Sequence, residues 1–512
     1  MRRVLAVLLG TIVAFAIAPL PAQQLGELAF PTSGSAAAQP HFKLGMLYLH
    51  SFEYESAAGA FKEAQRVDPG FAMAYWGEAM TYTHPVWNQQ NVAAARAALE
   101  RLAKTPGERQ ARAPTEREKG YLGAVEVLYG EGAKAWRDTA YAKSMADLAA
   151  RFPEDHEAQL FHALALLGLS QGVRDVPTYM KAGAIASAVF SRHPDHPGAA
   201  HYVIHSFDDP THAPLGLAAA RAYRKSSPDA GHSQHMTSHI FLALGMWDDV
   251  VSVNETAVAV VKRAAAKRGV TPSGCGHYPE WLQYGYLQQG RLGDAARVLE
   301  GCWNRPGTEG DGDDVEGMAG MRAAYIVDSR QWTGKHVEEP KGRLPSTIIH
   351  LAYGSGYAAI MRNDLASAKE ALGRMEPLVA RIPEQVQPYS RILVLEIKGM
   401  IQAAEGNGDA AIASVREAAE IDDGLPIPFG PPWTIKPPHE LLGEILAAQG
   451  KHADAYQEFV AALARTPRRP LAVLGLARSA EALGRGRDAE SAYALLQELW
   501  SKADPEAKEG IR

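Results

Sequence analysis

The sequence lacks most of the signals that mark the common enzyme classes. Its 512 residues contain no serine nucleophile elbow, no Walker loop, no H-E-x-x-H zinc motif and no cysteine-rich metal motif. Lysine and arginine form no block, and the formal net charge is only −6. Nucleic acid and anionic membrane surfaces are therefore poor candidate partners. After the N-terminus, no apolar run is long enough to span a bilayer.

The N-terminus has the three-part layout of a secretory signal. Two arginines precede an apolar run from Val4 to Ala18, and a Pro/Ala segment follows. This layout predicts a signal peptide over 1–22 that is cleaved after Ala22, with an uncleaved anchor as the alternative. The Ala-, Ser- and Gly-rich residues 23–40 are expected to form a flexible linker. We expect a mature protein that is periplasmic or secreted and is not attached to a membrane after cleavage.

Internal repeats are the main positive signal. The segment ESAAGAFKEAQRVDPGFAMAYWGEAM (55–80) has the small, aromatic and proline residues of a 34-residue tetratricopeptide unit. Similar units recur, each with a Gly or Asn turn followed by apolar residues at i, i+3, i+4 and i+7. No run of period-two alternation predicts a strand. The pattern therefore predicts an all-α fold, a right-handed superhelical TPR-like solenoid of antiparallel helix pairs.

Two breaks divide this predicted solenoid. Residues 305–317 are rich in Gly and Asp and are expected to form a loop, and 424–438 contain six prolines, which exclude a helix. We therefore predict an N-terminal TPR array over 41–305 and a C-terminal TPR array over 306–512, the latter including the Pro-rich connector 424–438.

The two cysteines lie at neighbouring ends of one predicted helix pair. Cys275 precedes the first helix of its unit, and Cys302 lies near the end of the second. A disulfide is reasonable there in an oxidising compartment, and two free buried thiols are the alternative.

Histidines gather on the first helices of three consecutive units. The turn glycines Gly245 and Gly290 and the proline Pro228 set the register of these units. In that register, nine positions that line the concave groove hold six histidines, whereas chance predicts about 0.3, because only 18 of 512 residues are histidine. The six are His201, His205, His232, His235, His239 and His277.

Imidazole-rich ligation suits copper, zinc or iron and argues against magnesium or calcium. The spacing therefore predicts one or two transition-metal ions in the groove, with a small-molecule substrate as a further partner. Asp208, Asp209 and His196 are expected to orient the ligands. If the protein is an enzyme, Glu280 and Tyr284 are the candidate acid/base residues. The alternative is a scaffold whose histidine-rich groove binds a peptide or protein without metal.

Several motifs resemble a bacterial family of exported TPR proteins. They are HPGAAHYVIHSFDDP (196–210), HSQHMTSHIF (232–241) and GHYPEWLQYGYLQQGR (276–291), which correspond to the family's wording HPGAAHYxIHSxDDP and HMxSHIF. The resemblance implies the repeat fold and marks seven characteristic histidines, namely the six above and His196. It implies no reaction. The sequence departs from the family at Thr237, where proline is usual, and at Glu280, where aspartate is usual.

Overall fold

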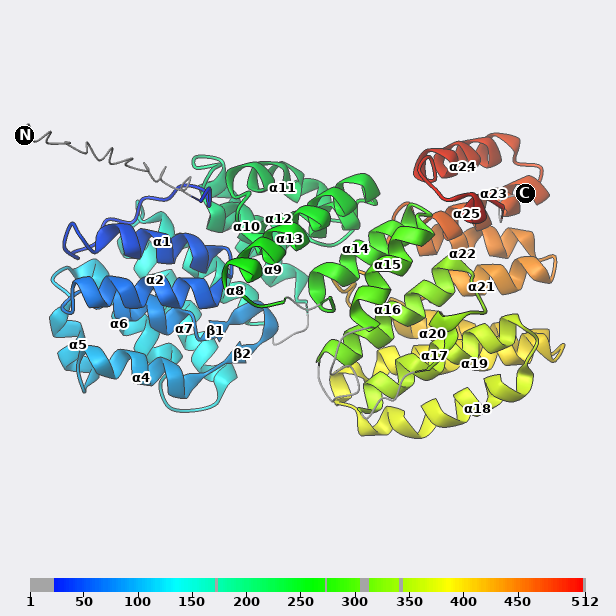
Figure 1. Cartoon of the computed structure of the whole chain (residues 1–512), viewed down its shortest axis with the longest axis horizontal. Coiled ribbons are helices and arrows are strands. Elements are labelled where there is room, and N and C mark those ends of the chain that lie inside the picture. The colour runs from blue at the N-terminus through cyan, green and yellow to red at the C-terminus, as the bar shows by residue number, and fades with distance from the viewer. Residues whose placement is uncertain (1–22, 171–173, 272–273, 304–312, 340–343, 510–512) are drawn as a thin grey trace, which may run out of the picture.

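The protein is a solenoid of antiparallel helix pairs. The computed structural model describes residues 23–170, 174–271, 274–303, 313–339 and 344–509. These residues form 25 α-helices and one two-stranded antiparallel ladder, in which Thr83 pairs with Gln90. Figure 1 shows the helices stacked pair upon pair along the long axis. The prediction of an all-α, TPR-like solenoid is confirmed. The predicted signal peptide lies outside the described residues.

The first half of the chain contains α1 (Gln39–His50), α2 (Tyr54–Val67), α3 (Ala72–Met80), β1 (Thr83–His84), η1 (Pro85–Trp87), β2 (Gln89–Gln90), α4 (Val92–Leu102), α5 (Pro106–Arg112), α6 (Glu116–Leu128), α7 (Lys134–Arg151), α8 (His156–Gly168), α9 (Val176–Phe190), α10 (Pro197–Phe207), α11 (Ala213–Ser226), α12 (Gly231–Ala243) and α13 (Trp247–Lys267). The second half contains α14 (His277–Gln288), α15 (Leu292–Trp303), α16 (Asp313–Ser329), η2 (Lys335–Val337), α17 (Pro345–Met361), α18 (Leu365–Met375), η3 (Glu376–Arg381), η4 (Glu384–Val386), α19 (Gln387–Ala404), α20 (Gly408–Asp423), α21 (Pro438–Ala448), α22 (His452–Arg465), α23 (Pro470–Ala482), α24 (Gly486–Leu499) and α25 (Pro505–Glu509).

Local signals fix where these helices begin and end. Asp155 and Asp175 accept hydrogen bonds from backbone N–H groups in the first turns of α8 and α9, as N-cap residues do. Gly245 and Gly290 adopt φ of +64° and +66° at the turns after α12 and α14. Glycine has no Cβ and enters this left-handed region without strain, so these two turns reverse the chain within each pair.

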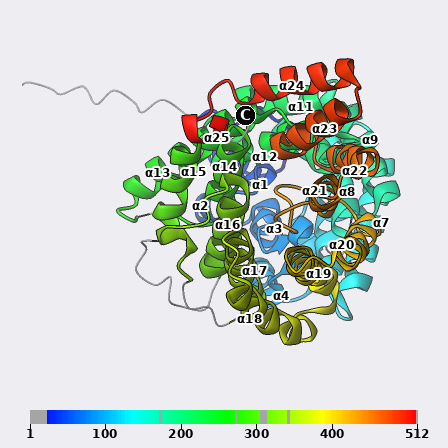
Figure 2. The ribbon, with the colours of Figure 1, turned by 90° about the vertical axis from the view of Figure 1, so that its right-hand side faces the viewer.

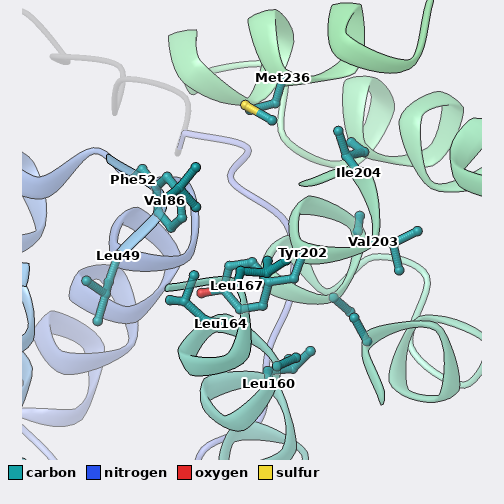
Figure 3. Close-up of a cluster of buried hydrophobic side chains, with 14 of the residues drawn as sticks. Leu49, Phe52, Val86, Leu160, Leu164, Leu167, Tyr202, Val203, Ile204 and Met236 are labelled. Atoms are coloured by element: carbon teal, nitrogen blue, oxygen red, sulfur yellow. The ribbon is translucent and has the colours of Figure 1, made fainter. Parts of the chain in front are cut away.

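The first helix packs against the middle of the solenoid rather than only against its neighbour in sequence. The Nδ1 of His50, at the end of α1, lies 2.9 Å from the hydroxyl of Tyr202 on α10. Figure 3 shows Leu49 and Phe52 in the same apolar cluster as Leu160, Tyr202 and others from α8 and α10. The N-terminal pairs therefore curl until the first repeat meets the histidine-bearing helices.

The C-terminal end turns back in the same way. The indole N–H of Trp500 donates to the carbonyl of Gln288 at 3.2 Å, and the backbone N–H of Asp504 donates to Gly290 at 3.0 Å. The indole of Trp247 donates to the carbonyl of Arg468 at 3.0 Å. Seen along the long axis in Figure 2, the helices lie around a common centre, with α25 near α14 and α15.

The expected flexible linker at 23–40 is instead part of the fold. Leu25, Leu28 and Phe30 are buried, and the N–H of Glu27 donates to the carbonyl of Asp195 at 2.9 Å. Its Ala/Ser/Gly composition predicted flexibility, but the three apolar side chains are buried, and the ring of Phe30 contacts those of Phe42 in α1, Trp76 in α3 and Tyr121 in α6. Helix α1 then begins at Gln39, inside the range predicted as linker.

The core is continuous across the predicted array boundary at 305/306. One apolar cluster joins Leu299 and Cys302 of α15 to Met318 and Tyr325 of α16. The predicted loop at 305–317 lies mostly outside the described residues, and α16 already begins at Asp313. The Pro-rich connector is described throughout and has no helix before Pro438, as its prolines predict. Among the described residues, no helix has the length and apolarity that crossing a membrane requires.

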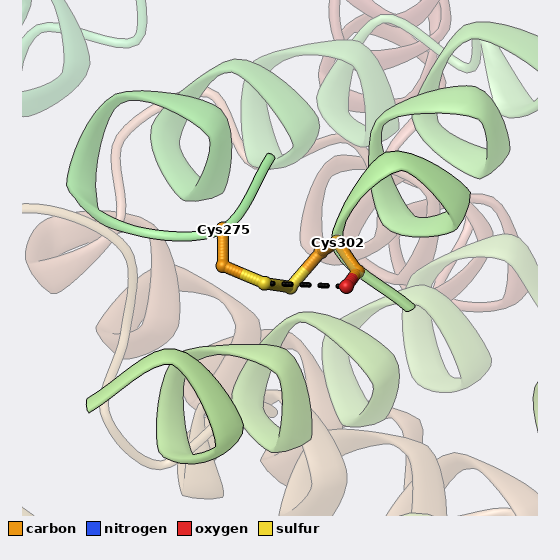
Figure 4. Close-up of a disulfide and its surroundings, with 2 residues drawn as sticks. All are labelled: Cys275 and Cys302. Atoms are coloured by element: carbon orange, nitrogen blue, oxygen red, sulfur yellow. Dashed lines mark hydrogen bonds between the residues drawn. A yellow bond between two sulfur atoms is a disulfide. The ribbon is translucent and has the colours of Figure 1, made fainter. Parts of the chain in front are cut away.

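Cys275 and Cys302 form a disulfide (Figure 4), with their Cα atoms 4.5 Å apart. Of the two alternatives left open by the sequence, the structure has the bridge rather than free thiols. The bridge attaches the segment just before α14 to the end of α15, and His277 follows Cys275 by two residues. It therefore fixes the start of the helix that carries the last histidine of the series.

Replacing both cysteines, as Cys275→Ser with Cys302→Ser, is expected to lower the free energy of unfolding by about 2–4 kcal/mol, because the unfolded chain regains the entropy of an open loop. Denaturant titration followed by circular dichroism measures this change. Two reactive thiols in unreduced, denatured wild-type protein would contradict the bridge.

Candidate metal centre

Three neighbouring helices bring six histidines together. Helix α10 carries His201 and His205, one turn apart; α12 carries three more at spacings of three and four residues; and His277 begins α14. Residues three and four apart share one helical face, so each helix directs its histidines to the same side. The five histidines of α10 and α12 are at most 6% exposed, and His277 is the least buried of the six.

The six imidazoles form two sets of three. His201, His205 and His232 make the first triad; His235, His239 and His277 make the second triad. Within each triad, one nitrogen of every ring lies within 4.8 Å of those of the other two. The triads adjoin each other, because the ring centres of His205 and His239 are 5.6 Å apart. Each set has the residue types and the spacing to hold a metal ion.

Hydrogen bonds fix the orientation of several rings through Nδ1. The Nδ1 of His201 lies 2.6 Å from the carbonyl oxygen of His50, and the Nδ1 of His235 lies 2.8 Å from Oδ1 of Asn254. The amide nitrogen of Asn254 donates to the carbonyl of Val250 at 2.8 Å, so its oxygen faces the histidine. Both partners are acceptors, so Nδ1 carries the proton and Nε2 carries the free lone pair. The Nδ1 of His232 lies 3.3 Å from the hydroxyl of Tyr278.

The Nε2 atoms are the distinctive feature of the cluster. In five of the six histidines this atom is buried and has no hydrogen-bond partner among the described residues: His201, His205, His232, His235 and His239. Buried polar atoms in folded proteins are almost always paired, so five unpaired nitrogens in one place require an explanation. A lone pair on Nε2 with Nδ1–H held by an acceptor is the arrangement of a histidine that ligates a metal.

Asp208 links the two triads. Its Oδ2 lies 3.0 Å from Nδ1 of His239 and 3.7 Å from Nδ1 of His205, one histidine from each set. Arg174 holds the other carboxylate oxygen in an ion pair. Burial alone would raise the pKa of Asp208, but the Arg174 guanidinium and the two histidines hold it below its usual range. The carboxylate therefore stays charged; it orients His239 of the second triad and lies near His205 of the first triad.

Asp209 does not contact the cluster directly. Its carboxylate accepts from Nη2 of Arg174 at 2.9 Å and lies 2.8 Å from Nδ1 of His212. It therefore supports the arginine that holds Asp208, one step further from the histidines than the sequence analysis placed it.

Five of the six histidines are neutral, because burial lowers their pKa below the ordinary value. Burial lowers the pKa of His201, His232 and His235 well below the ordinary value, and neighbouring imidazoles add to the effect. Burial lowers the pKa of His239 despite the adjacent Asp208, and it lowers the pKa of His277 to about 3. A metal ion binds the neutral form of imidazole, so the site needs to lose no proton from these rings to accept one.

Aromatic side chains cover the cluster, which the sequence placed on an open groove. Phe52, just after α1 and with φ of +53°, lies 4.2 Å from His201 between ring centres. Trp281 stacks on His239 at 4.4 Å, and Phe429 of the Pro-rich connector stacks on the same ring at 5.3 Å. The predicted histidines are therefore together, but they are buried because segments from both ends of the solenoid close over them.

A second histidine group lies beside the cluster and is fully hydrogen-bonded. Glu157 on α8 accepts from Nε2 of His50 at 2.7 Å and from Nε2 of His196 at 2.9 Å. His196 also caps α10, because its Nδ1 accepts from the N–H of Ala199. The other nitrogen of His50 meets Tyr202. With every ring nitrogen in use, this group positions its neighbours and leaves no lone pair for a metal.

The two predicted acid/base residues differ in their surroundings. Glu280 lies in the first turn of α14, where burial raises its pKa to about 7, with a further rise from Glu316. Tyr284, one turn later, meets Arg469 at 3.2 Å, and that guanidinium is paired with Asp328 and Glu440. Tyr284 is therefore part of an ion-pair network among the C-terminal helices, and no hydrogen bond joins its hydroxyl to the described histidines.

Sequence reasoning missed the partners Asn254, Arg174, His50 and Glu157. Asn254 left a detectable signal, as a lone amide on the apolar face of WDDVVSVNETAV (247–258). The others lie 34 to 151 residues from the groups they orient, and no local pattern indicates such distant contacts.

Comparison with known proteins gives no family. No family model and no curated protein matches the sequence. Among solved structures, the chain is similar to the Cut9–Hcn1 hetero-tetramer of the APC/C (13% identity, 88% of this chain and 78% of that chain, TM-score 0.35). It is also similar to yeast Tom70 (12%, 93% and 94%, 0.28) and to a human IFIT1 dimer with PPP-AAAA (14%, 91% and 91%, 0.36). At these TM-scores the similarities carry no information about what this chain binds. Fold and site together define a TPR-like solenoid with an internal cluster of histidines.

Replacing Arg174 with methionine is expected to lower the free energy of unfolding by about 3–5 kcal/mol, because it leaves the buried Asp208 carboxylate without its counter-ion. Denaturant titration in the presence of a chelator isolates this effect from metal binding. The control Arg268→Met removes the exposed pair with Glu55 and is expected to cost under about 1 kcal/mol. Equal losses in the two variants would contradict the role of Arg174.

Proposed function

We propose that the protein is an exported metalloprotein that binds two transition-metal ions, one in each histidine triad. The observation that carries the proposal is the set of five buried Nε2 atoms without partners, grouped as two triads. The resemblance of the first residues to a signal peptide and the disulfide support export, since disulfides persist in oxidising compartments.

The donor set favours particular ions. Each triad offers three imidazoles, which suit copper, zinc or iron, and copper(II) is the strongest binder among the common divalent ions for a given nitrogen site. Three protein ligands leave at least one coordination position open to another molecule, as in catalytic rather than structural sites. When bound, such an ion would act as a Lewis acid or a redox centre on that molecule. Glu280 is then the candidate for proton transfer, since its pKa of about 7 suits either direction of transfer.

A scaffold that binds a peptide or protein is the second candidate, because the concave surfaces of helical solenoids commonly serve this purpose. The buried histidines argue against their own direct contact with a peptide. Such a partner would use other surfaces of the solenoid, so the two functions can coexist on one chain.

Metal analysis tests the proposal directly. Protein purified without a histidine tag and equilibrated with copper(II) or zinc is expected to hold about two equivalents of metal, one per triad. The double variants His201→Ala with His205→Ala and His235→Ala with His239→Ala are each expected to hold about one, because each loses two of three ligands from one triad.

The matched control is His156→Ala with His193→Ala. These two imidazoles also contact each other, at 4.3 Å between ring centres, but belong to neither triad. This variant is expected to keep about two equivalents. Wild-type protein with less than about a tenth of an equivalent, after exposure to copper, zinc and iron, would refute metal binding.

Asp208→Asn is expected to weaken the binding of both ions, by about 10–100-fold in affinity, because it removes the negative charge 3.0 Å from Nδ1 of His239 and 3.7 Å from Nδ1 of His205. Competition against a chelator measures the two affinities. Asp155→Asn is the control, since Asp155 is also a buried carboxylate paired with an arginine, Arg117, at 3.1 Å. A lower affinity for only one of the two ions would mean that Asp208 supports metal binding in one triad alone.

A further inference from the structure

A cavity of about 510 Å³ adjoins the two triads. Its lining includes His232 of the first triad and His277 of the second triad. The Nε2 of His232 is buried and has no partner among the described residues. A molecule in this cavity therefore meets one proposed ligand of each ion, which makes the cavity the natural approach to both open coordination positions.

The walls of the cavity are aromatic and aliphatic. Trp87 and Tyr278 lie 5.9 Å and 6.3 Å from the ring of His232 between centres, and both line the space. Val258 and Val261 of α13 complete an apolar wall. Such walls favour a flat apolar group, and the volume is typical of small-molecule sites. The polar end lies at the two histidines.

The charge of the site determines which polar group the ligand carries at the end nearest the histidines. Imidazoles bind a metal ion in their neutral form and contribute no charge. The carboxylates near the triads are Asp208 and Asp209, which share the guanidinium of Arg174, and Glu53, which accepts from the backbone N–H of His232 at 3.2 Å. Two bound divalent ions would keep an excess of positive charge in a buried environment, which strongly favours an anionic ligand. Lys262, exposed at the same cavity, adds a further positive charge.

We propose that this cavity binds a small aromatic molecule that carries an anionic oxygen donor, with the ring between Trp87 and Tyr278 and the oxygen on the metal ions. This inference rests on the proposed metal function and specifies the substrate class of the same site.

A pair of hydroxamates tests the proposal, because both bind metal ions through the same two oxygens and only one has an aromatic ring. Calorimetric titration of the zinc-loaded protein avoids redox chemistry. Benzohydroxamate is expected to bind at least about tenfold more tightly than acetohydroxamate, since only its ring is buried in the cavity. Equal affinities, or no binding of either compound to zinc-loaded protein, would overturn the inference while leaving metal binding intact.

Two variants locate the ring. Val258→Trp fills the cavity. Trp87→Ala removes one of its walls, and the side chain that is lost is already 37% exposed. Each is expected to weaken the binding of benzohydroxamate at least about tenfold more than that of acetohydroxamate and to leave the zinc content unchanged. Val460→Trp, on the exposed face of α22, is the matched control for the larger side chain. Unchanged benzohydroxamate binding in both variants would place the ring elsewhere, whereas a protein that takes up no zinc would refute the metal function itself.

Discussion

The buried ion pair between Arg174 and Asp208 is the interaction on which the site depends. Asp208 follows the last residue of α10, so its carboxylate lies where that helix ends, next to His239 on α12. A carboxylate at this depth would take up a proton if it stood alone, and a protonated Asp208 would lose its charge as an acceptor. Arg174 keeps it charged, and one side chain then orients His239 of the second triad and lies near His205 of the first triad. The two triads are for this reason one structural unit.

The curvature of the solenoid is the second constraint. Each helix pair packs mainly on its neighbours, so a repeat array can carry a row of histidines on its inner helices without burying them. Here the ends of the array return to the middle. Phe52 follows the first helix, Phe429 belongs to the connector between the last pairs, and both rings rest on the histidines. The disulfide holds the start of α14 on the remaining side. Burial of the cluster is thus a consequence of closure.

Helical spacing was sufficient to predict the repeat fold and the set of six histidines. Register followed from Gly245 and Gly290, whose left-handed turns are local properties of the chain. The predictions that failed concern contacts between distant repeats, which depend on how the whole array curves. The linker at 23–40 has a flexible composition, yet Leu25 and Phe30 find a surface on helices far along the chain. Tyr284 shares a helix face with Glu280, but curvature brings Arg469 to it from 185 residues away. Pairwise spacing within a helix carries no information about contacts of this range.

Two buried histidines outside the triads show how this fold satisfies a structural histidine. His50 and His196 lie beside the cluster and are as buried as its members, but hydrogen bonds satisfy both nitrogens of each ring. A fold that can satisfy these two histidines could satisfy others in the same way. It leaves five Nε2 atoms unpaired instead, and each buried unpaired polar group costs about 1–3 kcal/mol. A role in packing alone does not account for five such unfavourable contributions to the free energy in one cluster. The metal binding that we propose rests on these five atoms, together with the Nδ1 protons that acceptors hold on His201, His235 and His239.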